Sequence, residues 1–390
     1  MDLLLNMLSA EHRQGQQRFA EVARSLVRVA RPELLRRIPD EVSLLDPLLV
    51  AYFTEPEPTV TLEQLLYGRM TPETRPARIT VRTDPDGAAE LPGIGTLHTD
   101  RGCASLVWEF GRELRDRSGL VSYTLAEQRH LPGTSMVLDE QISPVLHGFF
   151  AASGVRVPVI PDAGAERVRD VVNALELLTS IYPEYDRVIR QSTNRLVLFS
   201  STALNSFATP RAHGCVFLDT AYGRGSVFHL EDLLHQCGHV AFTAMTLDTG
   251  RVLGVDKDAP IGGTDDSGEP RTAYVVLHAV VTERLMAEGL LRAITSDLLG
   301  PMAQHEAAGR LGYILIRYAA DMTDLVTADI LAADGIPLGA RLLADLNRLV
   351  AAARPHVAGL DLSGQPYNFD TATFLARNPR PALITGGRCA

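Results

Sequence analysis

The sequence contains a single lysine, Lys257, although Lys and Arg together number 37. An anionic group of a ligand will therefore meet the planar fork of an arginine and not the point charge of a lysine. The formal net charge of −10 leaves no surplus of basic residues for the phosphates of a nucleic acid. We therefore expect no nucleic-acid partner.

Cysteine and long apolar runs are also scarce. The four cysteines form no C-x-x-C pair, which is typical of a reducing compartment without a disulfide framework. The longest apolar runs fall far short of the roughly 20 residues that a membrane-spanning helix needs. The chain opens with Met1 and Asp2, without the basic flank of a secretory signal. These absences predict a soluble, cytoplasmic protein with no membrane role.

The pattern of apolar residues predicts a mainly helical chain. Its 390 residues, 46% of them hydrophobic, are enough for more than one core. Helical spacing predicts helices over 10–38, 166–182, 230–247, 274–291, 301–333 and 338–353. Short β-branched runs predict strands between 55 and 100, over 196–200 and over 215–218, the last two as a candidate hairpin.

These elements predict an α+β fold, predominantly α-helical with a small β-sheet, and with a zincin-like helix for a metal in the C-terminal half. We expect an N-terminal mixed region for substrate recognition over residues 1–155 and a metal-binding catalytic domain over 156–356. Residues 357–390 are predicted to be an irregular tail. The Gly- and Asp-rich stretch over 250–271 is expected to be a long loop.

The most informative feature is a histidine pair. His235 and His239 stand one helical turn apart, so both imidazoles leave the same face of a helix and can share a metal ion. The spacing is that of H-E-x-x-H metalloproteases, in which the Glu is the general base. Here that position is Gln236, whose amide takes no proton at neutral pH. Gly238 in the same helix indicates that another segment approaches the backbone closely.

A metal site needs a third protein ligand. His278 is our choice, because it lies on the next predicted helix among apolar neighbours. Glu283 is the alternative, since a downstream Glu completes many zinc peptidase sites. The two residues are five apart and point about 140° from each other on a helix, so one ion will not easily take both. Glu231, one turn before His235, is a candidate to orient that ring from behind.

Three protein ligands on an octahedral metal leave three positions open. A bidentate 2-oxo acid and dioxygen would occupy these positions, as in non-haem Fe(II) oxygenases. That chemistry needs no general base and therefore tolerates Gln236, which a hydrolytic zincin would not. The residues alone also leave open two non-catalytic interpretations. The histidines could be core residues satisfied by hydrogen bonds, or the chain could be a binding protein without enzymatic activity.

Four segments together resemble a known family. They are Ser200–Ser201, Gly214–Leu218, Glu231–His239 and Pro270–His278. They resemble the bacterial HExxH-type, 2-oxoglutarate-dependent peptide β-hydroxylases, which tailor ribosomally made peptide natural products. The resemblance covers roughly residues 165–330, and Gln236 departs from its motif. It implies Fe(II) held by His235, His239 and His278, with 2-oxoglutarate and O2 as co-substrates, and hydroxylation at the β-carbon of a residue in a precursor peptide.

Other assignments follow as expectations. Arg271 and Arg317 are the candidates for the distal carboxylate of 2-oxoglutarate, although Asp321, one turn after Arg317, offers that residue an ordinary surface pair. A zinc metallopeptidase-like hydrolase, with Glu231 or Glu283 as its base, is the main alternative function. An oxygenase that acts on a free or carrier-bound amino acid is another. The sequence leaves the oligomeric state open, with a homodimer as one option.

Overall fold

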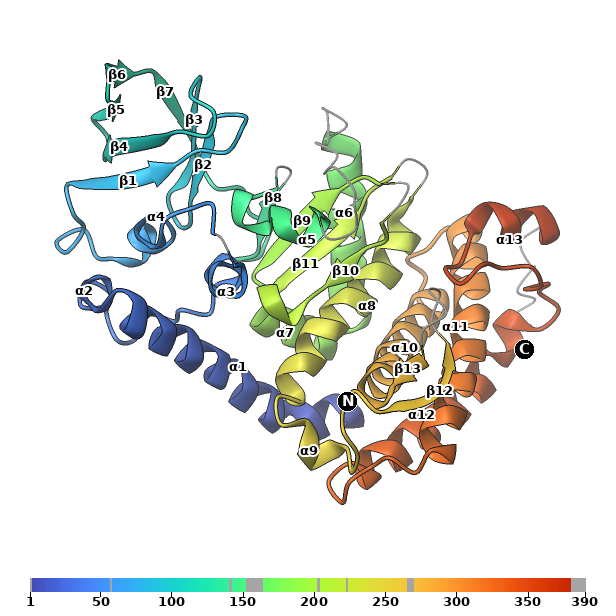
Figure 1. The fold of residues 1–390 in the computed structure, drawn as a ribbon. Coiled ribbons are helices and arrows are strands. Elements are labelled where there is room, and N and C mark those ends of the chain that lie inside the picture. Colours follow the sequence, from blue (N-terminus) through green and yellow to red (C-terminus); the bar gives the residue numbers. More distant parts are fainter. Residues whose placement is uncertain are drawn as a thin grey trace. The chain divides into compact units, whose positions relative to one another are not determined.

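The computed structural model describes residues 2–56, 58–139, 142–151, 164–201, 204–221, 224–264 and 270–379. Helices make up 54% and strands 15% of the described chain, in several small sheets (Figure 1). The predicted α+β class with a helical majority is confirmed. Among the described residues, no helix has both the length and the apolar character needed to cross a membrane.

The chain divides into two compact units. Unit 1 comprises Met1–Arg13, Glu166–Ile189 and Gly223–Ala390, and unit 2 comprises Gln14–Ala165 and Arg190–Tyr222. Both units are therefore assembled from separated stretches of the chain, whereas the three predicted segments are continuous. The predicted histidine site lies within unit 1.

Unit 1 is built from helices. Three long ones, α10, α11 and α12, lie side by side, and α10 also packs against α8 (Figure 1). Helix α10 begins where the Thr272 hydroxyl accepts a hydrogen bond from the amide of Val275, and α11 begins at Pro301. The elements of this unit are α6 (Gly164–Ile181), α7 (Pro183–Ser192), α8 (Ser226–Met245), α9 (Thr249–Val252), α10 (Ala273–Thr295), α11 (Pro301–Thr327), α12 (Ile336–Val357), α13 (Thr371–Arg377), β12 (Pro260–Thr264) and β13 (Pro270–Thr272).

Two glycines let α8 and α10 approach closely. A Cβ atom on Gly238 would lie 3.2 Å from side-chain atoms of both Thr282 and Leu285 on α10. A Cβ atom on Gly289 would lie only 2.4 Å from Leu234 on α8. The close approach predicted at Gly238 is confirmed, and it brings the imidazole-bearing faces of the two helices together.

Unit 2 contains three sheets of three or four strands. One sheet has the order β1-β4-β5-β6, a second β2-β3-β7 and a third β10-β11-β9-β8. The strands are β1 (Arg78–Arg82), β2 (Ala88–Leu91), β3 (Gly95–Thr99), β4 (Ser105–Glu109), β5 (Glu113–Asp116), β6 (Gly119–Val121), β7 (Tyr123–Ala126), β8 (Val137–Asp139), β9 (Arg195–Phe199), β10 (Phe207–Ala208) and β11 (Cys215–Asp219). The short helices α2 (Pro32–Leu35), α3 (Pro47–Thr54), α4 (Leu62–Leu66) and α5 (His147–Ala151) accompany them.

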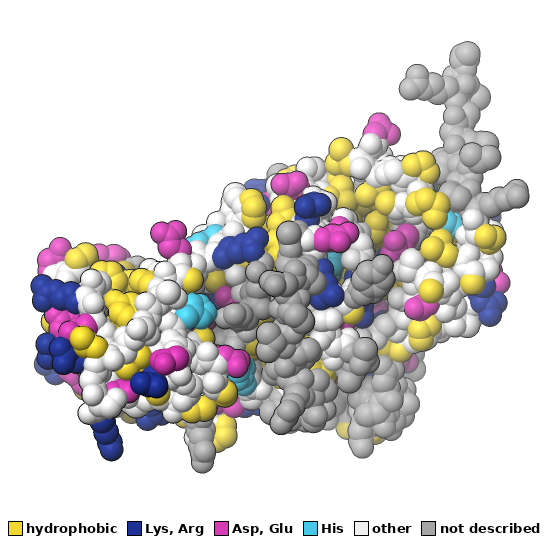
Figure 2. Space-filling view, turned by 90° about the horizontal axis from the view of Figure 1, so that it is seen from above, with side chains coloured by type: hydrophobic (Ala, Val, Ile, Leu, Met, Phe, Trp, Pro, Cys, Tyr) yellow, Lys and Arg dark blue, Asp and Glu magenta, His cyan; other side chains and the backbone are white. Residues whose placement is uncertain are grey.

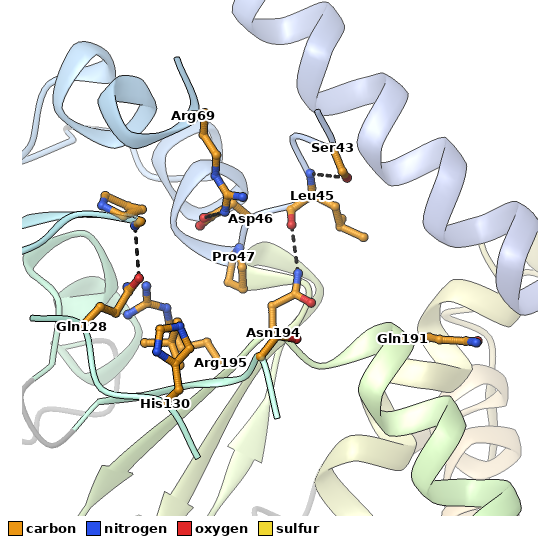
Figure 3. Close-up of a pocket in the computed structure, with 14 residues that line it drawn as sticks. Ser43, Leu45, Asp46, Pro47, Arg69, Gln128, His130, Gln191, Asn194 and Arg195 are labelled. Atoms are coloured by element: carbon orange, nitrogen blue, oxygen red, sulfur yellow. Dashed lines mark hydrogen bonds and ion pairs between the residues drawn. The ribbon is translucent and has the colours of Figure 1, made fainter. Parts of the chain in front are cut away.

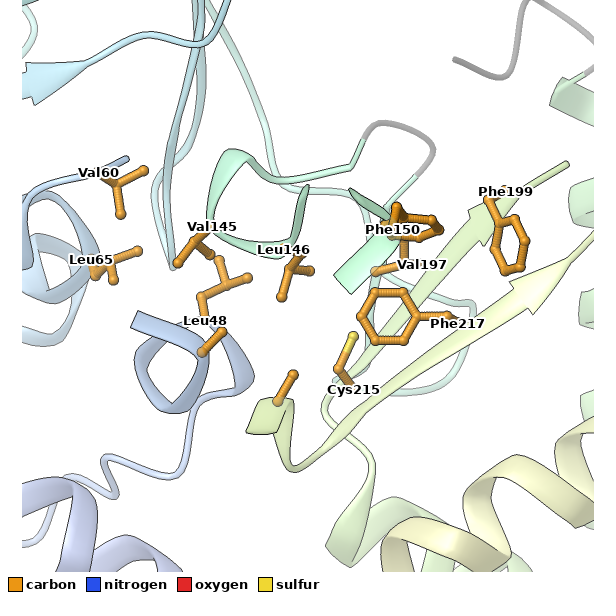
Figure 4. Close-up of a cluster of buried hydrophobic side chains, with 12 residues drawn as sticks. Leu48, Val60, Leu65, Val145, Leu146, Phe150, Val197, Phe199, Cys215 and Phe217 are labelled. Atoms are coloured by element: carbon orange, nitrogen blue, oxygen red, sulfur yellow. The ribbon is translucent and has the colours of Figure 1, made fainter. Parts of the chain in front are cut away.

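An aromatic core supports the third sheet. The ring of Phe150 from α5 meets the rings of Phe199 and Phe217 edge to face, with centroids 5.4 Å and 5.5 Å away (Figure 4). Strands β9 and β11, which carry Phe199 and Phe217, are parallel neighbours. The two strands were therefore predicted correctly, but the hairpin was wrong, because a hairpin joins antiparallel strands.

Three other predictions need correction. The first helix, α1, runs over Leu3–Ala30 and ends before Pro32, so it starts earlier than predicted. Helical spacing puts Val22, Leu26 and Val29 on one apolar face, but this face is exposed, with Val29 at 85%, whereas Ala23 and Val27 are buried. The predicted loop over 250–271 contains α9 and the paired strands β12 and β13, and the predicted irregular tail contains α13.

Charges of both signs are mixed on the surface. On the face drawn in Figure 2, arginine, acidic and hydrophobic side chains of the described residues are interspersed. Several exposed arginines of unit 2 form ion pairs, such as Arg78 with Glu109 at 2.8 Å. Exposed pairs of this kind contribute little to stability.

Candidate functional site

Three imidazoles meet where α8 and α10 face each other. The Nε2 atoms of His235 and His239 are 2.8 Å apart, as the spacing of one helical turn on α8 allows. The Nδ1 atom of His239 lies 2.7 Å from Nδ1 of His278 on α10. The structure therefore brings all three sequence-predicted ligands together, in a row with His239 in the middle.

Gln236 determines where the imidazole protons lie in this row. Its amide nitrogen is 3.1 Å from Nδ1 of His235 and 3.5 Å from the Asp232 carboxylate. An amide NH2 group only donates, so Nδ1 of His235 accepts and its proton is on Nε2. His239 then accepts at Nε2 and donates from Nδ1 to His278. Gln236 thus acts as a hydrogen-bond donor behind the first histidine and not as a base.

The remaining ring nitrogen of this row is isolated. Nε2 of His278 is buried and has no hydrogen-bond partner among the described residues. In the proton arrangement above, this atom carries an N–H group. A buried donor without an acceptor costs about 1–3 kcal/mol, so the position favours occupation by a polar group from a ligand.

All three imidazoles are held neutral. Burial lowers the pKa of His239 to about 4. Burial, followed by the charges of His239 and Arg317, holds the pKa of His235 well below its usual 6.5. Burial and the neighbouring His239 have the same effect on the pKa of His278. Neutral imidazoles are the form that binds metals.

Two aromatic rings frame His278, and sequence reasoning did not single them out. Tyr274, one turn earlier on α10, stacks on the imidazole with centroids 5.1 Å apart and planes 21° apart. Phe242 of α8 lies 5.2 Å from the same ring. The Tyr274 hydroxyl is 3.0 Å from that of Thr246. The four-residue spacing of Tyr274 and His278 was a readable signal of this stack.

The fit to a metal is partial. Neutral nitrogen donors in a partly apolar site suit Fe(II) or Zn(II) chemically. Two adjacent ligands on an octahedral ion with bonds of about 2.1 Å are about 3 Å apart, which is close to the 2.8 Å between Nε2 of His235 and Nε2 of His239. His278 does not fit in the orientation shown, because it contacts the opposite nitrogen of His239. Within the described ranges, no group of three His, Cys, Asp or Glu side chains is arranged to hold a metal.

The two candidate arginines have different partners. Arg271 makes a two-pronged contact with Asp321, with Nη2 2.8 Å from the carboxylate, so both arms of its guanidinium are occupied. Arg317 instead has its Nε atom 3.3 Å from Glu283 and its Nη2 atom 3.0 Å from the Tyr367 hydroxyl. The expected pair between Arg317 and Asp321 is thus replaced, because Asp321 is used by Arg271. Arg317 is the one whose charge acts on His235.

Glu283 is a buried carboxyl group next to this arginine. The residue is 1% exposed, and neither carboxyl oxygen has a hydrogen-bond partner among the described residues. Burial, and then the charge of Asp321, raise the pKa of Glu283 well above its usual range. This shift of the pKa favours the protonated form of Glu283. In that state it is a poor metal ligand and a poor general base.

Glu231 has a structural partner. Its carboxylate is 3.1 Å from Nη1 of Arg310, which also contacts Glu306 at 2.9 Å. This ion pair links α8 to α11, and no contact between Glu231 and His235 occurs among the described residues. His229, six residues before His235 on α8, is buried at 1% exposure, and burial lowers its pKa to about 3.

Comparison of the chain with known protein families and with curated proteins finds no match.

Proposed function

We propose that this protein is a non-haem Fe(II) and 2-oxoglutarate-dependent oxygenase that oxidises an amino-acid side chain, at the β-carbon of a residue in a precursor peptide. One observation carries the proposal. Three neutral imidazoles from α8 and α10 form a row in which neighbouring rings have nitrogen atoms 2.8 Å and 2.7 Å apart. Two of them present Nε2 atoms at a spacing suited to one ion.

His235 and His239 would hold the iron through Nε2. The proton on Nε2 of His235 would then move to Nδ1, where the Gln236 carboxamide would turn its oxygen to accept it. The bound iron supplies the activation of dioxygen. His278, the predicted third ligand, contacts the far edge of His239 in the orientation shown and would orient that ring. Tyr274 and Phe242 shield the imidazoles from water by packing on His278.

Arg317 is the stronger candidate for the distal carboxylate of 2-oxoglutarate. Its only carboxyl partner among the described residues is Glu283, whose raised pKa weakens the ion pair between them. Arg271 is already matched by the two-pronged contact with Asp321. Arginine binds carboxylates well in such a setting, because each charge-assisted hydrogen bond is worth about 1.5–3 kcal/mol.

The geometry disfavours the hydrolase alternative. A zinc hydrolase needs a carboxylate base near the metal-bound water. Gln236 cannot serve, Glu231 is paired with Arg310, and burial raises the pKa of Glu283, which favours its protonated form. An oxygenase needs none of the three as a base.

The proposal is tested with anaerobically purified protein. Addition of Fe(II) and 2-oxoglutarate should produce a weak visible charge-transfer band, and oxygen with a peptide substrate should release succinate. The His235→Ala and His239→Ala variants should lose both signals, whereas His98→Ala, on β3 of unit 2, should retain them. Tight zinc with chelator-sensitive peptide cleavage under argon would instead identify a hydrolase.

The arginine assignment has its own measurement. Arg317→Met should weaken 2-oxoglutarate binding by about 10- to 100-fold, as expected for the loss of one charge-assisted contact. Arg271→Met should change binding less and mainly lower stability, because it leaves Asp321 buried without its partner. Equal loss of binding in both variants would contradict the distinction.

A further inference from the structure

A pocket in unit 2 belongs to neither the imidazole row nor its arginines. Its volume is about 420 Å³, which is within the usual range for small-ligand sites (Figure 3). The lining comes from several segments of unit 2, including the turn before α3, the end of β7 and the start of β9. Most of the lining side chains are polar.

Two side-chain carboxamides in the pocket wall are each held by a hydrogen bond from only one of their two polar atoms. The Oε1 atom of Gln128 accepts a hydrogen bond of 3.1 Å from the amide of Gly93. The Nδ2 atom of Asn194 donates one of 2.9 Å to the carbonyl of Leu45. Figure 3 shows both bonds, made from separate segments of the wall.

The other halves of these two groups are complementary. Within the described chain, Nε2 of Gln128 and Oδ1 of Asn194 form no hydrogen bond, so one offers a donor and the other an acceptor. The backbone of Asn194 is itself held at both its N–H and its C=O, by Gly214 and Val137. The pocket thus presents a pre-oriented donor and a pre-oriented acceptor.

The charges in the wall are already matched. Arg195, buried at 2% exposure, contacts Glu90 at 2.7 Å and also Asp139. Arg69 contacts Asp46 at 2.7 Å. Because each guanidinium has a carboxylate partner, the pocket has no unmatched cation for an anionic ligand, and an uncharged ligand fits better.

We propose that this pocket binds an uncharged peptide segment, with Gln128 donating to a backbone carbonyl and Asn194 accepting from a backbone N–H. A peptide backbone supplies both partners, a C=O that accepts and an N–H that donates. The volume accommodates only a few peptide units. The inference rests on unit 2 alone and is independent of the iron chemistry.

The test uses the full chain and N-acetyl-trialanine N-methylamide, an uncharged probe. Its binding is followed by saturation-transfer NMR and by the side-chain amide signals of the protein. The Gln128 and Asn194 NH2 signals should shift on titration. Gln128→Met should weaken binding by about three- to tenfold, the equivalent of one neutral hydrogen bond. The matched control Gln17→Met removes an exposed carboxamide on α1 and should change nothing.

Two further probes decide the ligand class. Acetate tests for an anion held by the arginines, and maltose tests for a hydroxyl-rich ligand. Stronger binding of either than of the capped peptide would overturn the proposal, and so would the absence of any shift with the peptide. If Gln128→Met misfolds, the titration of the wild-type protein with the capped peptide still tests the proposal. Loss of succinate release with peptide binding intact would overturn only the oxygenase.

Discussion

At the scale of single residues, the site depends on which atom of each side chain faces which neighbour. Gln236 occupies the position of a hydrolytic base but donates to His235. Arg317 makes one contact with the Glu283 carboxyl, whereas Arg271 contacts the Asp321 carboxyl with both arms of its guanidinium. The residue types were readable from the sequence, but their partners were not, because Asp321 could have served either arginine.

Asp139 provides a residue-scale prediction of pH dependence. Burial, opposed by Arg195 and reinforced by the charge of Glu90, raises its pKa from 3.8 to about 7. Between these values the folded state keeps a proton that the unfolded state has lost. The stability of unit 2 should therefore fall as the pH rises from about 4 to 7, by an amount on the order of 2–4 kcal/mol.

The Asp139→Asn variant should lack this decline, because the amide stays neutral throughout. Urea unfolding at several pH values checks this prediction. The signal is the fluorescence of Trp108, which is the only tryptophan in the sequence and is buried in unit 2. Asp40→Asn, at an exposed acid of the same unit, is the control and should keep the wild-type slope. If the stability of Asp139→Asn fell with pH as steeply as that of the wild type, the Asp139 carboxyl would be ionised in the folded state.

At the scale of elements, the contact between α8 and α10 positions the imidazoles. Gly238 and Gly289 allow the two backbones to approach, and His239 and His278 meet across the same interface. The helices themselves follow from local periodicity and capping. The close approach of the two helices cannot be predicted from local patterns, because it depends on the volumes of side chains on a helix some 40 residues away.

The two glycines should respond differently to replacement by alanine. In Gly289→Ala the new methyl would meet Leu234 at 2.4 Å, and we expect a loss of about 1–3 kcal/mol from overpacking. In Gly238→Ala the nearest atoms are 3.2 Å away, and the helix propensity gained, about 1 kcal/mol, offsets the tight contact. Chemical denaturation followed by circular dichroism measures both. Equal losses would show that α8 and α10 are not held at this separation.

At the scale of the whole molecule, unit 1 joins segments from far apart in the chain. Asp2 is buried against Arg284 of α10 at 2.5 Å, and Asp345 of α12 contacts the same guanidinium at 3.0 Å. The Tyr182 hydroxyl, at 2.6 Å from this arginine, completes the cluster. A buried charge cluster of this kind contributes little over apolar packing, but the loss of one member leaves a charge without its partner.

Asp2→Asn should therefore lower the stability of unit 1 by about 3 kcal/mol at neutral pH. The pKa of Asp2 is lowered from 3.8 despite burial, mainly by Arg284, so its contribution is present above that value and is lost as the pH falls below it. Hydrogen exchange of α10 and α12 measures the change. Asp334→Asn, in an exposed pair with Arg251, should have almost no effect. Comparable losses at both positions would contradict the role of the buried cluster.

Local sequence patterns were enough to predict the five long helices α6, α8, α10, α11 and α12, the strands near 196–200 and 215–218, and the shared face of His235 and His239. Each of these depends on neighbours within one or two turns, where periodicity and capping act. Only the tertiary structure decided the parallel order of β9 and β11, the partners of Arg271 and Arg317, and the contact between His239 and His278. These depend on packing between elements that are distant in the chain, and that packing selects one arrangement of side chains from several that the local pattern allows.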